Sequence, residues 1–95
     1  MSDTATFVAA AMRHHFTVRL DACPNALTRL LGPLVIHDVL PDRIESVRAV
    51  DGLLVRLELT ATPDIARRLA DRMTAMVPVH DVIAVPIAES TSAAA

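Results

Sequence analysis

The sequence predicts an α+β sandwich whose elements follow the order β, α, β, β, α, β. Three observations carry this prediction. An alternating strand pattern runs from His15 to Asp21, a tight-turn dipeptide stands at Asp51-Gly52 between two β-rich runs, and two stretches of helical periodicity separate the strands. This is the order of the split βαβ arrangement, a ferredoxin-like four-stranded antiparallel sheet with two helices on one face.

The first strand and the first helix are joined by a short loop. From His15 to Asp21 apolar and polar residues alternate, as a half-buried strand requires. Pro24 suits the first turn of a helix, and apolar residues from Leu27 to Val35 recur at three- and four-residue spacing. Gly32-Pro33 interrupts that pattern, because proline lacks a backbone donor and crowds the carbonyl four residues earlier. We therefore expect this helix to kink or to end early.

A β-hairpin is predicted with strands from about Arg43 to Val50 and from Leu53 to Thr60. Asp51-Gly52 between them fits a type I′ turn, which needs positive φ at both central residues. In that register Arg48 shares the inward face with the apolar residues of the second strand. We expect either a bulge that turns Arg48 outward or a long stem that reaches water.

The second helix begins at Thr62-Pro63-Asp64, which combines an N-cap hydroxyl, a first-turn proline and an acidic residue near the positive helix end. Pro78 closes the helix, and a nearly continuous apolar run from about Val82 to Ile87 predicts the last strand. The apolar stripe of the helix comprises Ile65, Leu69, Met73 and Met76.

One domain is expected, because 95 residues with 53% hydrophobic content can bury only one modest core. We place this domain at residues 14–88, with a flexible N-terminal extension at residues 1–13 and a disordered tail at residues 89–95. A small sheet with an open face and exposed edges tends to hide them by pairing, so we expect a homodimer.

The composition argues against nucleic-acid and membrane partners. A net charge of -2 gives no broad positive field, and two phenylalanines are the only aromatic side chains for base stacking. No apolar run approaches the roughly 20 residues that cross a bilayer. The single cysteine cannot form an internal disulfide, and the charge order of the first residues is the reverse of a signal peptide's. We expect a cytoplasmic protein.

The chain offers little for catalysis. Its two glycines form no phosphate loop, and its acidic residues have no spacing that pairs a general acid with a base. Cys23 is more simply explained as a small loop residue than as a nucleophile. We expect no enzyme activity, no cofactor and no metal. A metal-binding protein or small enzyme is the less favoured alternative, and it would use His14, His15, His37 or His80.

Two stretches resemble an ACT domain. The run from Phe16 to Gly32 resembles the opening of such a domain, and Ala26-Leu27-Thr28-Arg29-Leu30-Leu31-Gly32 is similar to the Ala-Leu-Ser-Arg-Val-Ile-Gly pattern of acetolactate synthase small subunits. Residues 57–63 and 76–85 are similar to the later part of the same domain, which ends in Leu-Val-Asp-Val-x-x-Val. Together the matches cover about residues 15–88, as in the short, single-domain version of that subunit.

The resemblance implies an ACT-like fold and a non-catalytic regulatory subunit of acetolactate synthase in branched-chain amino-acid biosynthesis. It implies a dimer whose sheets join side by side, a catalytic-subunit partner, and a small amino acid such as valine held at the dimer interface by the first loop. Carried onto this sequence, the ligand-binding residues are Asp21, Ala22, Cys23, Pro24, Asn25, Ala26 and Leu27.

Two positions of that loop depart from the family pattern. Asn25 stands at the glycine position, and Ala22 stands where an Asp or Asn side chain usually binds the ligand. Asp21, one residue out of register, is a candidate substitute for the missing polar side chain. A stand-alone ACT-type sensor of another small metabolite is therefore the alternative function.

Overall fold

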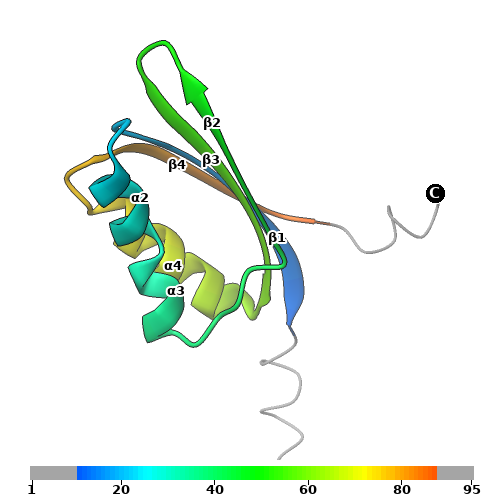
Figure 1. Cartoon of the computed structure of the whole chain (residues 1–95). Coiled ribbons are helices and arrows are strands. Elements are labelled where there is room, and N and C mark those ends of the chain that lie inside the picture. The colour runs from blue at the N-terminus through cyan, green and yellow to red at the C-terminus, as the bar shows by residue number, and fades with distance from the viewer. Residues whose placement is uncertain (1–10, 88–95) are drawn as a thin grey trace, which may run out of the picture.

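The computed structural model describes residues 11–87, and Figure 1 shows the arrangement of its elements. Most of the residues expected to form the N-terminal extension and the tail lie outside this range. Along the chain the elements are β1 (Met12–Leu20), α2 (Pro24–Leu30), α3 (Gly32–Ile36), β2 (Arg43–Ala49), β3 (Gly52–Ala61), α4 (Pro63–Thr74) and β4 (Val79–Pro86).

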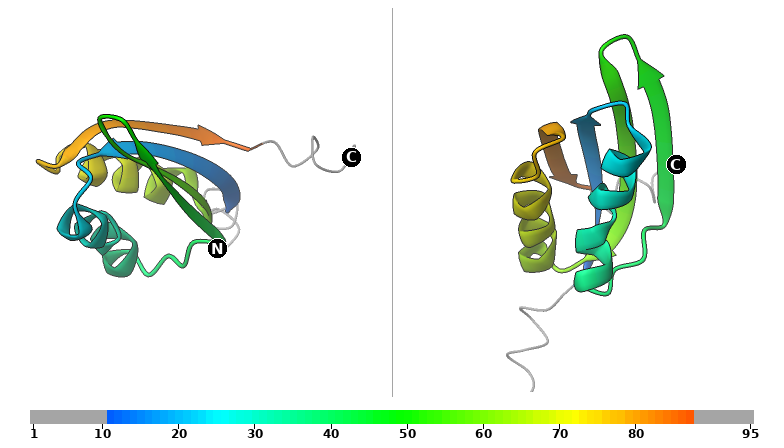
Figure 2. Two further views of the ribbon diagram at one scale, coloured as in Figure 1. Left: turned by 45° about the horizontal axis from the view of Figure 1, so that its top comes forward. Right: turned by 60° about the vertical axis from the view of Figure 1, so that its left-hand side comes forward.

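The four strands form one antiparallel sheet in the order β2-β3-β1-β4. The helices cover one face of this sheet and leave the other open (Figure 2). The predicted ferredoxin-like fold is confirmed. The core lies between the helices and the two central strands, and its largest fully buried side chains are Phe16, Val18, Leu20, Leu30, Val55, Leu57, Leu59, Leu69 and Met73.

β1 starts at Met12, three residues earlier than the expected start at His15. Met12 pairs with Ala61 and Arg13 with Thr60, so both residues belong to the folded sheet. In the sequence, the polar His14 at an inward position interrupts the alternation of apolar and polar residues. In the structure His14 is buried, and its Nε2–H donates to the carbonyl oxygen of Ala61 at 3.1 Å, which satisfies the polar ring inside the fold.

The first helix is divided as predicted. α2 ends at Leu30, and α3 begins at Gly32 with Pro33 in its first turn. A proline there needs no backbone N–H, because the first N–H groups of a helix have no intrahelical acceptor. Pro33 is also buried, so its ring contributes to the core side of α3.

The hairpin turn differs from the prediction. Val50 and Asp51 are its central residues, because Ala49 pairs with Gly52 as the last rung of the ladder. The prediction of a type I′ turn across Asp51-Gly52 is wrong, because Asp51 does not have a positive φ. Gly52 has a φ of 156°, and a Cβ on it would lie 2.7 Å from the carbonyl oxygen of Leu20. The glycine therefore serves the close approach of β3 to the end of β1.

Of the two alternatives for Arg48, the bulge is wrong. The β2–β3 register is continuous, with Arg48 opposite Leu53, Ser46 opposite Val55 and Ile44 opposite Leu57. The observed register differs from the predicted one by two residues, which leaves every side chain on the same face. Arg48 stays on the helix side of the sheet and is nevertheless exposed, because β2 is an edge strand whose seven residues are all exposed.

α4 starts as predicted, since the Thr62 hydroxyl oxygen accepts a hydrogen bond from the Ile65 N–H at 3.3 Å. The helix ends at Thr74, so Met76 lies in the following turn and not on the helical stripe. β4 begins at Val79, earlier than expected. Its pairing with β1 skips His80, which marks a bulge opposite Arg19 and Leu20. Residues 11–87 contain no helix long and apolar enough to cross a membrane.

Candidate functional site

The loop that joins β1 to α2 is held by backbone hydrogen bonds. The Asp21 N–H donates to the Pro78 carbonyl at 2.9 Å, and the Cys23 N–H turns back to the Asp21 carbonyl at 2.8 Å. The Cys23 carbonyl then accepts the first bonds of α2. Asn25 lies inside α2, and among residues 11–87 only Asp38 and Gly52 have a positive φ. Asn25 therefore fits the position that glycine holds in ACT domains.

One side of this loop faces the edge strand β2 across a hollow of about 240 Å³, which we name the loop–β2 hollow. Four of its seven lining residues come from the loop and the start of α2, and the other three come from the hairpin strands. Its lining residues are Ala22, Cys23, Pro24, Leu27, Ser46, Arg48 and Leu53. The fold thus brings four of the seven predicted site residues against two polar residues of β2 that sequence reasoning did not select.

The other side of the loop borders a second hollow of about 260 Å³, between the loop and the turn after α4. Asp21, Asn25 and Ala26 line this hollow and are absent from the loop–β2 hollow, while Cys23 lines both. The predicted site is therefore divided. A side chain at position 25 takes no space from the loop–β2 hollow.

Asp21 is engaged elsewhere. The Nε2–H of His80 donates to the Asp21 Oδ1 at 2.6 Å, and both side chains are more than half exposed. This pair ties the end of β1 to the bulge of β4. Because its carboxylate faces His80 and does not line the loop–β2 hollow, Asp21 does not replace the Asp or Asn side chain missing at Ala22.

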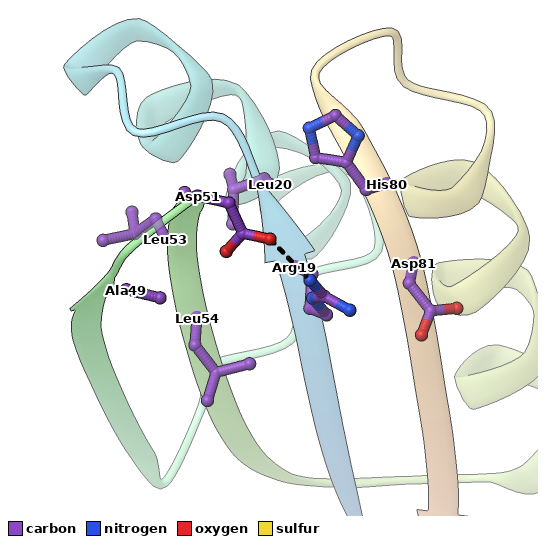
Figure 3. A pocket seen from close by; sticks show the side chains of 9 residues that line it. Arg19, Leu20, Ala49, Asp51, Leu53, Leu54, His80 and Asp81 are labelled. Atoms are coloured by element: carbon purple, nitrogen blue, oxygen red, sulfur yellow. Dashed lines mark hydrogen bonds and ion pairs between the residues drawn. The ribbon is translucent and has the colours of Figure 1, made fainter.

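A third hollow of about 480 Å³ lies at the end of the sheet, between the hairpin and the start of β4 (Figure 3). Arg19 donates to the Asp51 carboxylate at 3.2 Å across this hollow, and His80 and Asp81 line its other side. Arg19 is thus bonded to one carboxylate and lies opposite a second, that of Asp81, on β4. Sequence reasoning missed this cluster because its members come from three different strands or turns.

The four histidines occupy separate surroundings. His14 is bonded to the backbone of β3, His15 lies 3.8 Å from Glu58 on the open face, His37 follows α3, and His80 pairs with Asp21. Within residues 11–87 no group of three His, Cys, Asp or Glu side chains is arranged to hold a metal ion. The histidine-based alternative therefore finds no shared centre in this part of the chain.

The loop–β2 hollow combines a cation with apolar walls. Arg48 has no ion-pair partner among residues 11–87, and Ser46 adds a hydroxyl beside it. Leu27, Leu53 and Pro24 supply hydrocarbon surface, and no carboxylate lines the hollow. Such a lining suits a small ligand that carries a negative charge and an apolar group.

Comparisons with known proteins define the fold class. No family model matches the sequence, and no curated protein matches it either. An uncharacterised protein of Thermotoga maritima has a similar structure, with a TM-score of 0.70 and 13% identity over 83% of this chain and 100% of that one.

Two domains of larger proteins are similar as well. The ACT domain of GTP pyrophosphokinase from Chlorobium tepidum superposes with a TM-score of 0.67 and 15% identity over 80% of this chain and 100% of that one. The C-terminal domain of the MgtC protein from Mycobacterium tuberculosis superposes with a TM-score of 0.66. It is 17% identical over 82% of this chain and 89% of that one. At these identities the likeness establishes an ACT-like fold.

Proposed function

We propose that this chain is a non-catalytic regulatory module of ACT type. In this proposal it dimerises through β2, holds a small metabolite in the loop–β2 hollow, and acts on the catalytic subunit of acetolactate synthase. The observation that carries the proposal is the position of that hollow between the first loop and an edge strand whose outer side is unpaired within residues 11–87.

The size of the hollow supports a site shared by two copies. Its volume of about 240 Å³ is below the roughly 300–1,000 Å³ of common ligand pockets. Because β2 forms one wall, a second copy that adds its own β2 to the sheet would close the open side. The hollow would then be completed by residues of both protomers.

The exposed apolar residues near β2 support dimerisation at this edge. Ile44 is 47% and Val47 50% exposed, although both lie within a strand, and Val35 and Leu40 before the strand are still more exposed. Open strand edges with apolar side chains tend to pair with another chain. A β2-to-β2 contact would cover the edge together with the Ile44 and Val47 side chains.

The acetolactate synthase partner rests on sequence resemblance alone, chiefly on Ala26–Gly32 and residues 76–85. The non-catalytic role likewise rests on that resemblance.

Sedimentation of the purified chain tests the dimer. We expect a dimer for the native sequence and a monomer for the Ile44→Lys/Val47→Lys variant, because like charges on facing edges repel. Ile83→Lys/Val85→Lys is the matched control on the opposite edge strand β4, where both side chains are also about half exposed. Dissociation by the β4 variant alone would refute assembly through β2.

Affinity capture tests the partner. The tagged chain is used to recover proteins from a lysate of its source, and we expect a thiamine-diphosphate-dependent acetolactate synthase subunit among them. Recovery of this chain alone would favour the stand-alone sensor. The alanine at position 22 favours that alternative, since it removes a side chain that ACT domains commonly use for their ligand.

A further inference from the structure

We infer that the loop–β2 hollow selects a small apolar carboxylate that lacks an ammonium group, such as a branched 2-oxo acid, over the corresponding α-amino acid. This inference rests on the proposed function, because it concerns the ligand of the same site. It follows from the positive charge of Arg48 in the lining of the hollow and from the lack of a carboxylate in that lining.

The hollow offers a positive charge for the carboxylate. Arg48 lies on the helix side of β2, lines the hollow, and forms no ion pair with any carboxylate of residues 11–87. A guanidinium binds a carboxylate with two parallel hydrogen bonds, and the nearby Ser46 hydroxyl supplies a further donor.

No negative charge is available for an ammonium group. Ala22 presents a methyl group where ACT domains commonly place a polar side chain. Two of the acidic residues that lie near lining residues in the chain are engaged elsewhere: Asp21 with His80 at 2.6 Å and Asp51 with Arg19 at 3.2 Å. Glu45 on β2 alternates with Ser46 and therefore lies on the open face of the sheet, away from the hollow.

A second copy paired through β2 would not correct this imbalance. The helix-side residues that β2 brings to such a contact are Ile44, Ser46 and Arg48. The partner's β2 would therefore add a second guanidinium and no carboxylate. An ammonium group enclosed between these strands would lose its water without gaining an ion pair, which is costly.

The walls limit the rest of the ligand. Leu27 and Leu53 provide apolar surface beside Pro24, and the hollow's volume of about 240 Å³ accommodates a short hydrocarbon chain. The carboxylate end would face Arg48, and the hydrocarbon end would contact the leucines. A 2-oxo group adds an acceptor for the Ser46 hydroxyl, whereas an amino group would add a charge of the wrong sign.

Isothermal titration calorimetry with two probes of the same carbon skeleton tests the inference on the full chain. We expect 3-methyl-2-oxobutanoate to bind at least about tenfold more tightly than L-valine. Amide chemical-shift changes should centre on residues 22–27 and 46–48. Arg48→Gln should abolish binding, whereas Arg43→Gln, the same charge change on the open face of the same strand, should leave the affinity unchanged.

A second variant reverses the preference. Ala22→Asp restores an anionic partner for the ammonium group, so we expect it to bind L-valine more tightly than the 2-oxo acid. The position is exposed, so the substitution leaves the core untouched.

The outcomes separate the inference from the proposed function. Tighter binding of L-valine to the native chain would overturn the inference and leave the regulatory module standing. Equal loss of affinity in Arg43→Gln and Arg48→Gln would also overturn it, since the effect would then be one of net charge. If neither probe shifts residues 22–27, both the inference and the proposed ligand site fail.

Discussion

Replacing Gly52 with alanine tests why this glycine is needed. Its φ of 156° lies outside the range that residues with a Cβ adopt readily, and such strain costs about 1–3 kcal/mol. The added Cβ would also lie 2.7 Å from the Leu20 carbonyl oxygen, a backbone atom that moves only with β1. Forcing an extra carbon into a packed site adds roughly 1–3 kcal/mol. We expect Gly52→Ala to lower the free energy of unfolding by about 3 kcal/mol.

A loss of about 3 kcal/mol lowers Tm by about 12–24 °C in a domain of this size. Urea unfolding followed by far-UV circular dichroism suits a chain with no Trp or Tyr. The matched control is the other glycine of the sequence. A Cβ on Gly32 meets nothing within 4 Å, and its φ is not in the positive range, so Gly32→Ala should be neutral or stabilise by about 0.4–1 kcal/mol.

The comparison of the two alanine variants decides whether the reasoning holds. A Gly52→Ala variant whose free energy of unfolding lies within about 0.5 kcal/mol of the native value would refute it, because surface substitutions without a structural cause usually stay in that range. An equal loss in Gly32→Ala would show that the effect comes from the alanine and not from the close approach to β1.

Three further substitutions test other parts of the fold by the same unfolding measurement. Thr62→Ala removes the hydroxyl that caps α4 at the Ile65 N–H and should cost about 1 kcal/mol, whereas Thr62→Ser should retain the cap. Leu69→Ala, at a fully buried position, should cost about 2–5 kcal/mol, and a loss below about 1 kcal/mol would contradict its place in the core. A double-mutant cycle with Asp21→Asn and His80→Gln should give a coupling energy of about 0–1 kcal/mol, because the pair is exposed to solvent; a coupling well above that range would show that the contact is more than a surface ion pair.

Several elements could be predicted because their causes are local. The helix break follows from the proline at position 33, and the start of α4 follows from the hydroxyl at position 62, each within a few residues of its effect. The alternation of β3 is equally local. The turn was misplaced because Asp51-Gly52 fits a local rule, while the actual reason for the glycine is the Leu20 carbonyl, which lies in another strand.

The candidate site shows the same division between local and long-range causes. The loop from Asp21 to Leu27 could be selected from the sequence, but its division between two hollows could not. That division depends on β2, which borders one side of the loop, and on the turn after α4, which borders the other. Asp21 is also bonded to His80, which is 59 residues away along the chain. Arg48 and Ser46 were not selected because nothing near them in the sequence marks a ligand site. Their role depends on the distance between β2 and the first loop.

The family resemblance selected the loop from Asp21 to Leu27 as a candidate ligand site. The sequence by itself determined the order of the elements and most of the buried positions of β1, β3 and α4. Those properties depend on periodicity, proline chemistry and capping, which act over a few residues. Only the tertiary structure decided the hairpin register, the exposed edge of β2 and the charges that surround the loop–β2 hollow. Those depend on contacts between strands far apart in the chain, and no local pattern records which charges such contacts bring together or keep apart.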